Sequence, residues 1–130
     1  MESGKRYREN RRKKILFVEY PRCGTCQKAK KWLNENGVEY EDRHIVEVQP
    51  TREELVEWVK LSGLPLKKFF NTSGKLYKDL DLKNKLATMS EDEQLDLLAS
   101  NGMMVKRPIV VKDEKVLVGF KESEWSEALK

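Results

Sequence analysis

The chain has 130 residues, of which 37% are charged and 38% hydrophobic, and its formal net charge is +4 at pH 7. This length fits one domain with a core of its own, and no apolar run approaches the roughly 18 residues that a membrane-spanning helix needs. No apolar segment follows the basic N-terminus as it would in a secretory signal, so we expect a cytoplasmic protein without a membrane partner.

The positive charge is concentrated at the N-terminus. Residues 1–14 hold seven lysines and arginines against two glutamates, a net charge of +5, whereas residues 15–130 hold 19 basic and 20 acidic side chains, a net charge of −1. We therefore expect a disordered basic tail over residues 1–14 and one nearly neutral domain over residues 15–130. Such tails occur in nucleic-acid-binding arms and also as plain extensions, and we expect no direct contact with nucleic acid.

The first predicted element is a strand that leads into a pair of cysteines. Residues 15–20 are rich in Ile, Phe, Val and Tyr, a composition typical of strands, and Pro21 ends the run. Cys23 and Cys26 follow, and the residues after them favour a helix. The pattern predicts a strand, a tight turn, and a helix that begins beside Cys23 and ends at Gly37.

The predicted position of Cys23 favours a reactive thiol. Free N–H groups at a helix N-terminus attract an anion, and Arg22 and the lysines of the helix, Lys30 among them, add positive charge. We expect the pKa of Cys23 to lie below the ordinary value of about 8.5. Cys26, one turn further along, should be less exposed and within reach of Cys23, which suits an attacking and a resolving thiol.

The small number of possible ligands restricts the chemistry of this site. The chain has two cysteines and a single histidine, His44, so a structural zinc site is excluded and we expect no metal and no cofactor. The remaining alternatives are a redox pair or two incidental thiols. Gly24 and Thr25 shape the turn, where Thr25 either donates a hydrogen bond to the sulfur or only fills space.

A polar-rich second strand is expected over residues 38–45, followed by a helical segment over about residues 51–101. The sequences Thr51–Glu54 and Ser90–Glu93 both match a capping box, which marks the start of a helix. Between these two helices we expect a short helix that starts near Pro65 and one further helical element over residues 76–86. The three tryptophans, Trp32, Trp58 and Trp125, all lie in predicted helices and are expected to pack in the core.

Two strands and a helix complete the chain. Residues 108–111 have the composition of a buried strand, and residues 115–119 form its predicted hairpin partner across a turn at Asp113 and Glu114. A final helix is expected over residues 122–130. The element order is therefore β-α-β, a helical insert, and β-β-α.

Three motifs in this order resemble the arsenate reductase (ArsC)/Spx family: residues 21–29 with the two cysteines, residues 71–80, and residues 106–111. The resemblance covers about residues 15–129 and implies an α/β, thioredoxin-like fold with a mixed four-stranded sheet. In that family the proline before the third strand is cis and faces the cysteine. The resemblance therefore implies a cis Arg107–Pro108 bond and a site-shaping role for Pro108.

Some residues of this chain differ from the family pattern, and these differences help to distinguish arsenate reductases from Spx-like proteins. Glutathione-linked arsenate reductases use one nucleophilic cysteine, here Cys23, and three arginines that hold the oxyanion. Only Arg107 matches, because Asn71 and Phe120 occupy the other two positions. Arginine forks bind oxyanions through paired, charged hydrogen bonds, and lysines such as Lys67, Lys68, Lys75 or Lys121 lack that planar fork. This argues against arsenate as the substrate.

The second cysteine points toward disulfide chemistry. Cys26 stands where the reductases have serine, so that a Cys23–Cys26 disulfide can form, as in the Spx regulators. Gln27, however, stands where Spx has arginine, and the Spx proteins have a longer C-terminal extension.

Three functions remain open. In the first, a thiol-disulfide redox protein, Cys23 attacks a disulfide or an oxidised protein thiol, Cys26 resolves the intermediate, and glutathione, glutaredoxin or thioredoxin resets the pair. The second is an Spx-like redox-sensing transcriptional regulator that docks on RNA polymerase, and the third is a glutathione- or glutaredoxin-linked arsenate reductase. Arg107 is either an anion or thiolate partner in these schemes or a surface charge before a strand. We expect a monomer.

Overall fold

A computed structural model describes residues 15–130, and the predicted basic tail over residues 1–14 lies outside this range. Its four strands are β1 (Ile15–Glu19), β2 (Tyr40–His44), β3 (Ile109–Lys112) and β4 (Lys115–Val118), arranged in the order β2-β1-β3-β4. β1 and β2 are parallel, whereas β3 is antiparallel to both of its neighbours. This confirms the predicted α/β, thioredoxin-like fold with a mixed four-stranded sheet.

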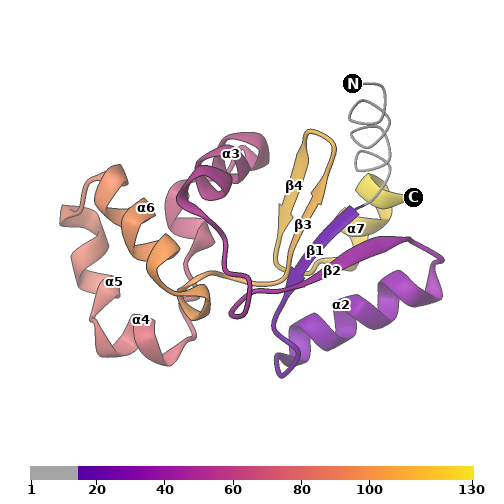
Figure 1. The fold of residues 1–130 in the computed structure, drawn as a ribbon, viewed down its shortest axis with the longest axis horizontal. Coiled ribbons are helices and arrows are strands. Elements are labelled where there is room, and N and C mark those ends of the chain that lie inside the picture. The colour runs from indigo at the N-terminus through magenta and orange to yellow at the C-terminus, as the bar shows by residue number, and fades with distance from the viewer. Residues whose placement is uncertain (1–14) are drawn as a thin grey trace.

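Helices cover both faces of the sheet (Figure 1). Phe17 of β1 packs with α2 (Gly24–Glu35) and α7 (Glu122–Leu129) on one face, whereas its neighbour Val18 points into a second cluster with α3 (Arg52–Ser62) on the other. This alternation follows from the two-residue period of a strand. The three tryptophans are at most 6% exposed, which confirms their predicted packing role.

The helices with clear end signals lie where the sequence predicts them. Thr51 and Ser90 each accept from the backbone N–H three residues on, and the Glu side chain there accepts from their own N–H, so both capping boxes are present. At the end of α2, Gly37 has φ of +66°, and Val38 N–H donates to Leu33 O at 3.0 Å, as expected at a C′ glycine.

The segment between β2 and β3 contains seven short helical elements. They are α3, η1 (Leu66–Phe69), α4 (Lys75–Asp79), α5 (Leu82–Lys85), η2 (Leu86–Thr88), α6 (Glu91–Ser100) and η3 (Gly102–Met104), of which the η elements are 3₁₀ turns. Figure 1 shows α4, α5 and α6 to one side of the sheet. The described residues contain no helix long and apolar enough to cross a membrane.

One prediction for this segment is wrong and another is confirmed. The prediction of a single helical element over residues 76–86 is wrong. Asp81 takes a left-handed conformation (φ +54°) between α4 and α5 and is the N-cap residue of α5. Asn84 Nδ2 then donates to Asp81 Oδ1 at 2.9 Å, and this local bond stabilises the break. The short helix predicted near Pro65 is present as the 3₁₀ turn η1.

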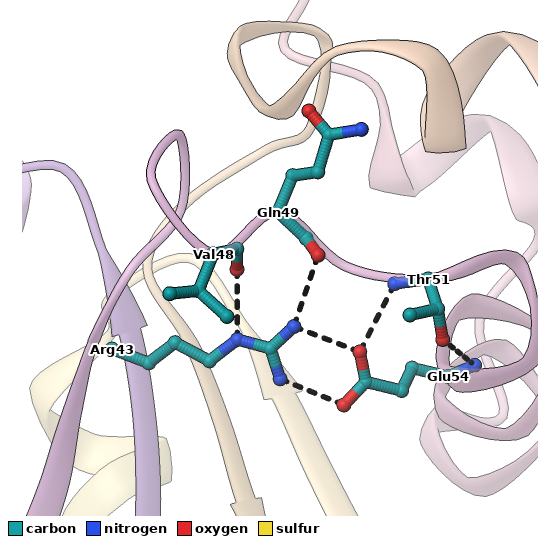
Figure 2. A network of polar contacts seen from close by, with 5 residues as sticks. All are labelled: Arg43, Val48, Gln49, Thr51 and Glu54. Atoms are coloured by element: carbon teal, nitrogen blue, oxygen red, sulfur yellow. Dashed lines mark hydrogen bonds and ion pairs between the residues drawn. The ribbon is translucent and has the colours of Figure 1, made fainter.

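An arginine fork joins the sheet to the helical segment (Figure 2). Arg43, in β2, donates through Nη1 and Nη2 to both carboxylate oxygens of Glu54 in α3, at 2.7 and 2.8 Å. The same guanidinium donates to the carbonyls of Val48 and Gln49 in the connecting loop. Glu54 also caps α3, so the Arg43–Glu54 pair holds together the end of β2, the connecting loop and the start of α3.

Candidate functional site

The two cysteines sit at the start of α2, immediately after the turn that follows β1. Cys23 is the N-cap residue with an extended backbone (φ −82°, ψ 123°), and Cys26 lies in the first turn of the helix. Both are free thiols; Cys23 is partly exposed and Cys26 is fully buried. This is the asymmetry that the sequence predicts, with the outer sulfur open to attack and the inner one shielded.

The turn is held by the backbone of Tyr20, a residue for which the sequence predicts no role in the site. Its carbonyl accepts from the Cys23 N–H at 2.9 Å, and its backbone also hydrogen-bonds the Cys26 sulfur. Gln27 adds a bond from its side chain to the Pro21 carbonyl at 2.9 Å. The position of Tyr20, last in the strand-like run before Pro21, is the only sequence signal for this role.

The two sulfurs differ strongly in acidity. Burial by itself would raise the pKa of Cys23, but hydrogen bonds from the Cys26 backbone and thiol and from the Thr25 backbone favour the thiolate. The charge of Arg107 acts in the same direction, and the pKa of Cys23 lies below its ordinary value, as predicted. Burial, together with the neighbouring Cys23, raises the pKa of Cys26 to about 12.

Gly24 and Thr25 are the first two residues of α2 and directly follow Cys23. Thr25 contributes its backbone N–H to the Cys23 sulfur, which favours the first of the two expected alternatives, through the backbone rather than the hydroxyl. Gly24 is the first residue of α2, and a Cβ there would meet nothing within 4 Å. A side chain would therefore fit at position 24 without a steric clash.

Arg107 lies beside the thiols and is held by two other contacts. Its guanidinium carbon is 5.1 Å from the centroid of the Tyr20 ring, and Nη1 donates to the Met103 carbonyl at 3.4 Å. Its Nε is buried without a hydrogen-bond partner, alone in this respect among the side chains of residues 15–130. Its charge lowers the pKa of both cysteines, and its side chain lines the same cleft as Cys23.

The cis Arg107–Pro108 bond is present, which confirms the prediction made from the resemblance. Pro108 is buried between Arg107 and the start of β3, and its carbonyl accepts from Gly119 N–H at 2.8 Å. Gly119 has φ of +79° and accepts a hydrogen bond from Trp125 Nε1 at 3.1 Å. These bonds tie the loop that bears Arg107 to the end of β4 and to α7.

Cys23 opens onto a cleft of about 730 Å³. Fifteen residues line it: Cys23, Thr25, Asn71, Thr72, Ser73, Gly74, Lys75, Leu76, Met103, Lys106, Arg107, Val118, Gly119, Phe120 and Lys121. The three positions that carry arginine in the arsenate reductases, 71, 107 and 120, thus converge on one cleft. Lys75 and Lys121 line this cleft, whereas Lys67 and Lys68 line a separate hollow.

Lys30 does not have the role that its place in the sequence predicts. Instead of adding positive charge beside Cys23, its Nζ lies 3.2 Å from Glu19 Oε2 and 2.6 Å from Asp42 Oδ2. Glu19 is 3% exposed, and burial with the neighbouring Asp42 raises its pKa. The three side chains join α2 to β1 and β2, so Lys30 has a structural role that only the tertiary pairing reveals.

The described part of the chain contains no group of three or more His, Cys, Asp or Glu side chains that could hold a metal ion. His44 lies at the end of β2, where its Nδ1 accepts from the backbone N–H groups of Val46 and Glu47 at 3.1 Å. Its ring packs edge-on against Tyr20. These contacts are those of a structural residue.

Comparisons with known proteins agree with this geometry. The model of the ArsC family matches residues 18–128. YusI of Bacillus subtilis is 58% identical over 113 residues, covering 87% of this chain and 96% of YusI. The regulatory protein MgsR of the same organism is 32% identical over 110 residues (85% and 86%), and the global transcriptional regulator Spx 2 of Bacillus anthracis is 29% identical over 110 residues (85% and 82%).

A solved structure is also closely similar. The crystal structure of an ArsC-family-related protein from Bacteroides fragilis superimposes with a TM-score of 0.87 and is 62% identical, covering 90% of this chain and 98% of the other. The family match spans nearly all the residues that the structure describes. The chain therefore belongs to the ArsC family.

Proposed function

We propose that this protein is a thiol-disulfide redox protein that works through Cys23 and Cys26 in a reducing compartment such as the cytoplasm. The Cys23 thiolate attacks one sulfur of a substrate disulfide, forms a mixed disulfide and releases the second substrate sulfur as a thiolate. Cys26 then loses its proton and attacks the Cys23 sulfur, which releases the reduced substrate and leaves a Cys23–Cys26 disulfide. An external thiol such as glutathione, glutaredoxin or thioredoxin returns the two electrons.

The observation that carries this proposal is the opposite shift of the two thiols. The pKa of Cys23 is lowered at a partly exposed helix N-terminus, while that of Cys26 is raised to about 12 in a fully buried position beside it. An attacking thiol needs a large thiolate fraction and access to substrate. A resolving thiol needs proximity to the mixed disulfide and protection from other oxidants.

The same cleft argues against arsenate reduction. Arg107 faces it together with Asn71 and Phe120, where the reductases have arginines. Each charged hydrogen bond to an oxyanion contributes about 1.5–3 kcal/mol, so two missing forks cost several kcal/mol of anion affinity. Lysines in the cleft offer point charges without the paired geometry.

The test is a redox titration of the full chain in glutathione buffers, read by alkylation and mass spectrometry. We expect one Cys23–Cys26 disulfide with a potential between about −300 and −120 mV, the range of redox-active proteins. Cys26→Ser should accumulate a mixed disulfide on Cys23, and Cys23→Ser should form none. A pair that stays reduced throughout this range, or a Cys23→Ser variant that still forms a mixed disulfide, would contradict the proposal.

A second candidate is a redox-sensing regulator, which the similarity to MgsR and Spx 2 favours. In this version the Cys23–Cys26 state changes a surface that docks on RNA polymerase. Pull-down of polymerase subunits by the oxidised but not the reduced chain, with loss of the difference in Cys26→Ala, would favour the regulator. Capture in neither state would leave the oxidoreductase.

A further inference from the structure

The cleft beside Cys23 is lined by positive charge alone. Lys75, Lys106, Arg107 and Lys121 contribute four cations, and none of the fifteen lining residues is acidic. Residues 15–130 of this chain have a net charge of −1, so the cleft differs sharply from the average surface. A surface of one sign beside a reactive atom concentrates ligands of the opposite sign.

Three of the four cations are available to a ligand. Lys75 Nζ lies 2.7 Å from Asp79 Oδ2 and is neutralised by that pair. Lys106, Arg107 and Lys121 take part in none of the ion pairs found within the described range. Two of them, Lys106 and Lys121, are exposed.

The lysines approach the cleft from two different loops. Lys106 precedes β3, and its side chain passes beside Gly119, which follows β4. A Cβ built on Gly119 would lie 3.3 Å from Lys106 Cε. Lys121 follows two residues later and lines the same cleft. Arg107 is fixed against the Tyr20 ring, a third position in the lining. The positive charge of the cleft is therefore contributed by two separate loops.

The rest of the lining fits an extended chain. Leu76, Met103, Val118 and Phe120 provide apolar surface, and Asn71, Thr72 and Ser73 provide hydrogen-bonding groups. Thr72, Ser73 and Lys75 are exposed, so the cleft is open along this wall. A segment of a larger chain can enter and leave there, whereas a small ligand would use only part of the surface.

We propose that this cleft selects protein disulfides whose cysteine is flanked by acidic residues. The inference rests on the proposed thiol-disulfide function and names its substrate class. Carboxylates next to the substrate cysteine contact Lys106 and Lys121 while Cys23 attacks the substrate sulfur. In this thiol-disulfide exchange the substrate disulfide gains two electrons and two protons, and the Cys23–Cys26 pair loses them.

The test compares disulfide-linked dimers of three short peptides, each with one cysteine flanked on both sides by two Glu, two Gln or two Lys. Their rates with the reduced full chain are followed by mass spectrometry after acid quench. Each rate is divided by that of the same peptide with dithiothreitol, which removes intrinsic differences in disulfide reactivity. We expect the Glu peptide to react about tenfold faster than the Gln peptide at low salt and the difference to shrink at 1 M salt, where the Debye length is about 3 Å.

Matched variants locate the effect. Lys106→Gln combined with Lys121→Gln should reduce the Glu-to-Gln rate ratio at least threefold. Lys60→Gln combined with Lys115→Gln removes the same charge from exposed lysines outside the cleft and should preserve the ratio. Oxidised glutathione, a small anionic disulfide, should react more slowly than the Glu peptide after the same normalisation.

The outcomes separate this inference from the proposed function. Equal normalised rates for the three peptides, or a ratio unchanged in the cleft variant, would overturn the acidic preference while leaving the redox function intact. Oxidised glutathione as fast as the Glu peptide would overturn the assignment to a protein segment. Failure of all the disulfides to oxidise Cys23 and Cys26 would overturn the proposed function and this inference with it.

Discussion

The reactivity of Cys23 is set by a few groups around one sulfur. Its lowered pKa means that the thiolate fraction, and with it the alkylation rate, rises with pH through a midpoint below the ordinary value for cysteine. Arg107→Gln removes a charge that favours the thiolate, so we expect the midpoint to move upward. The measurement is the rate of iodoacetamide alkylation at Cys23 against pH, in a Cys26→Ala background for both proteins.

Arg22→Gln provides the matched control, because Arg22 adjoins Cys23 in sequence but is exposed. It should shift the midpoint less than Arg107→Gln does. Equal shifts would mean that diffuse positive charge, and not the placement of Arg107, lowers the pKa of Cys23. In the native pair Cys26 should stay unalkylated at neutral pH, since it is buried and its pKa is about 12.

Among the elements, the fork of Arg43 on Glu54 is a bidentate, partly buried ion pair that links the sheet to the helical segment (Figure 2). A lysine at this position keeps the charge but loses the bidentate geometry and the bonds to the loop carbonyls. The Arg43 side chain is 14% exposed, so the lost bonds are poorly replaced by water. We expect Arg43→Lys to lower the free energy of unfolding by about 1–3 kcal/mol, measured by urea denaturation.

Arg52→Lys is the matched control for this change. Arg52 also bonds two carboxylates, Asp92 and Asp96, but these are 85% and 68% exposed, and solvent screens such pairs. The loss of stability should be much smaller than for Arg43→Lys. An equal loss in the free energy of unfolding would show that the fork on Glu54 stabilises the contact between the sheet and the helical segment no more than an exposed ion pair does.

At the scale of the whole molecule, local sequence signals predicted where strands and helices begin and end. Contacts between residues far apart in the sequence determined the side-chain partners. The strand before Pro21, the capping boxes at Thr51 and Ser90, and Gly37 are all read from neighbours along the chain, and the structure places each as predicted. Lys30 was misread because its partners, Glu19 and Asp42, come from two strands that only the fold brings together.

The cleft was only partly predictable for the same reason. The resemblance to the family predicts that Cys23, Arg107, Asn71 and Phe120 share one site, but no local pattern predicts that Lys106 belongs to it. Its place depends on how the segment before β3 lies beside Gly119, which follows β4 at the open end of the hairpin. The break at Asp81 was missed because an aspartate in the left-handed conformation leaves a pattern of leucines that reads as one helix.

The helical segment returns to the sheet through η3, and this return positions one wall of the cleft. Asn71 N–H donates to Met104 O at 2.9 Å, and Lys106 N–H donates to Phe69 O at 2.8 Å, so the two cleft walls are tied together. Gly102 opens η3 and packs against the backbone after β2. A Cβ there would overlap the Ile45 carbonyl oxygen and lie 2.8 Å from its carbonyl carbon.

Gly102→Ala should therefore destabilise the whole molecule, because backbone on both sides must move to make room. We expect a loss of about 1–3 kcal/mol in the free energy of unfolding, the usual cost of overpacking, measured by urea denaturation with tryptophan fluorescence. Gly24→Ala is the control, because a Cβ at the start of α2 meets nothing within 4 Å and alanine favours the helix by up to about 1 kcal/mol. If Gly102→Ala were as stable as Gly24→Ala, the close contact between η3 and the residue after β2 would not exist in solution.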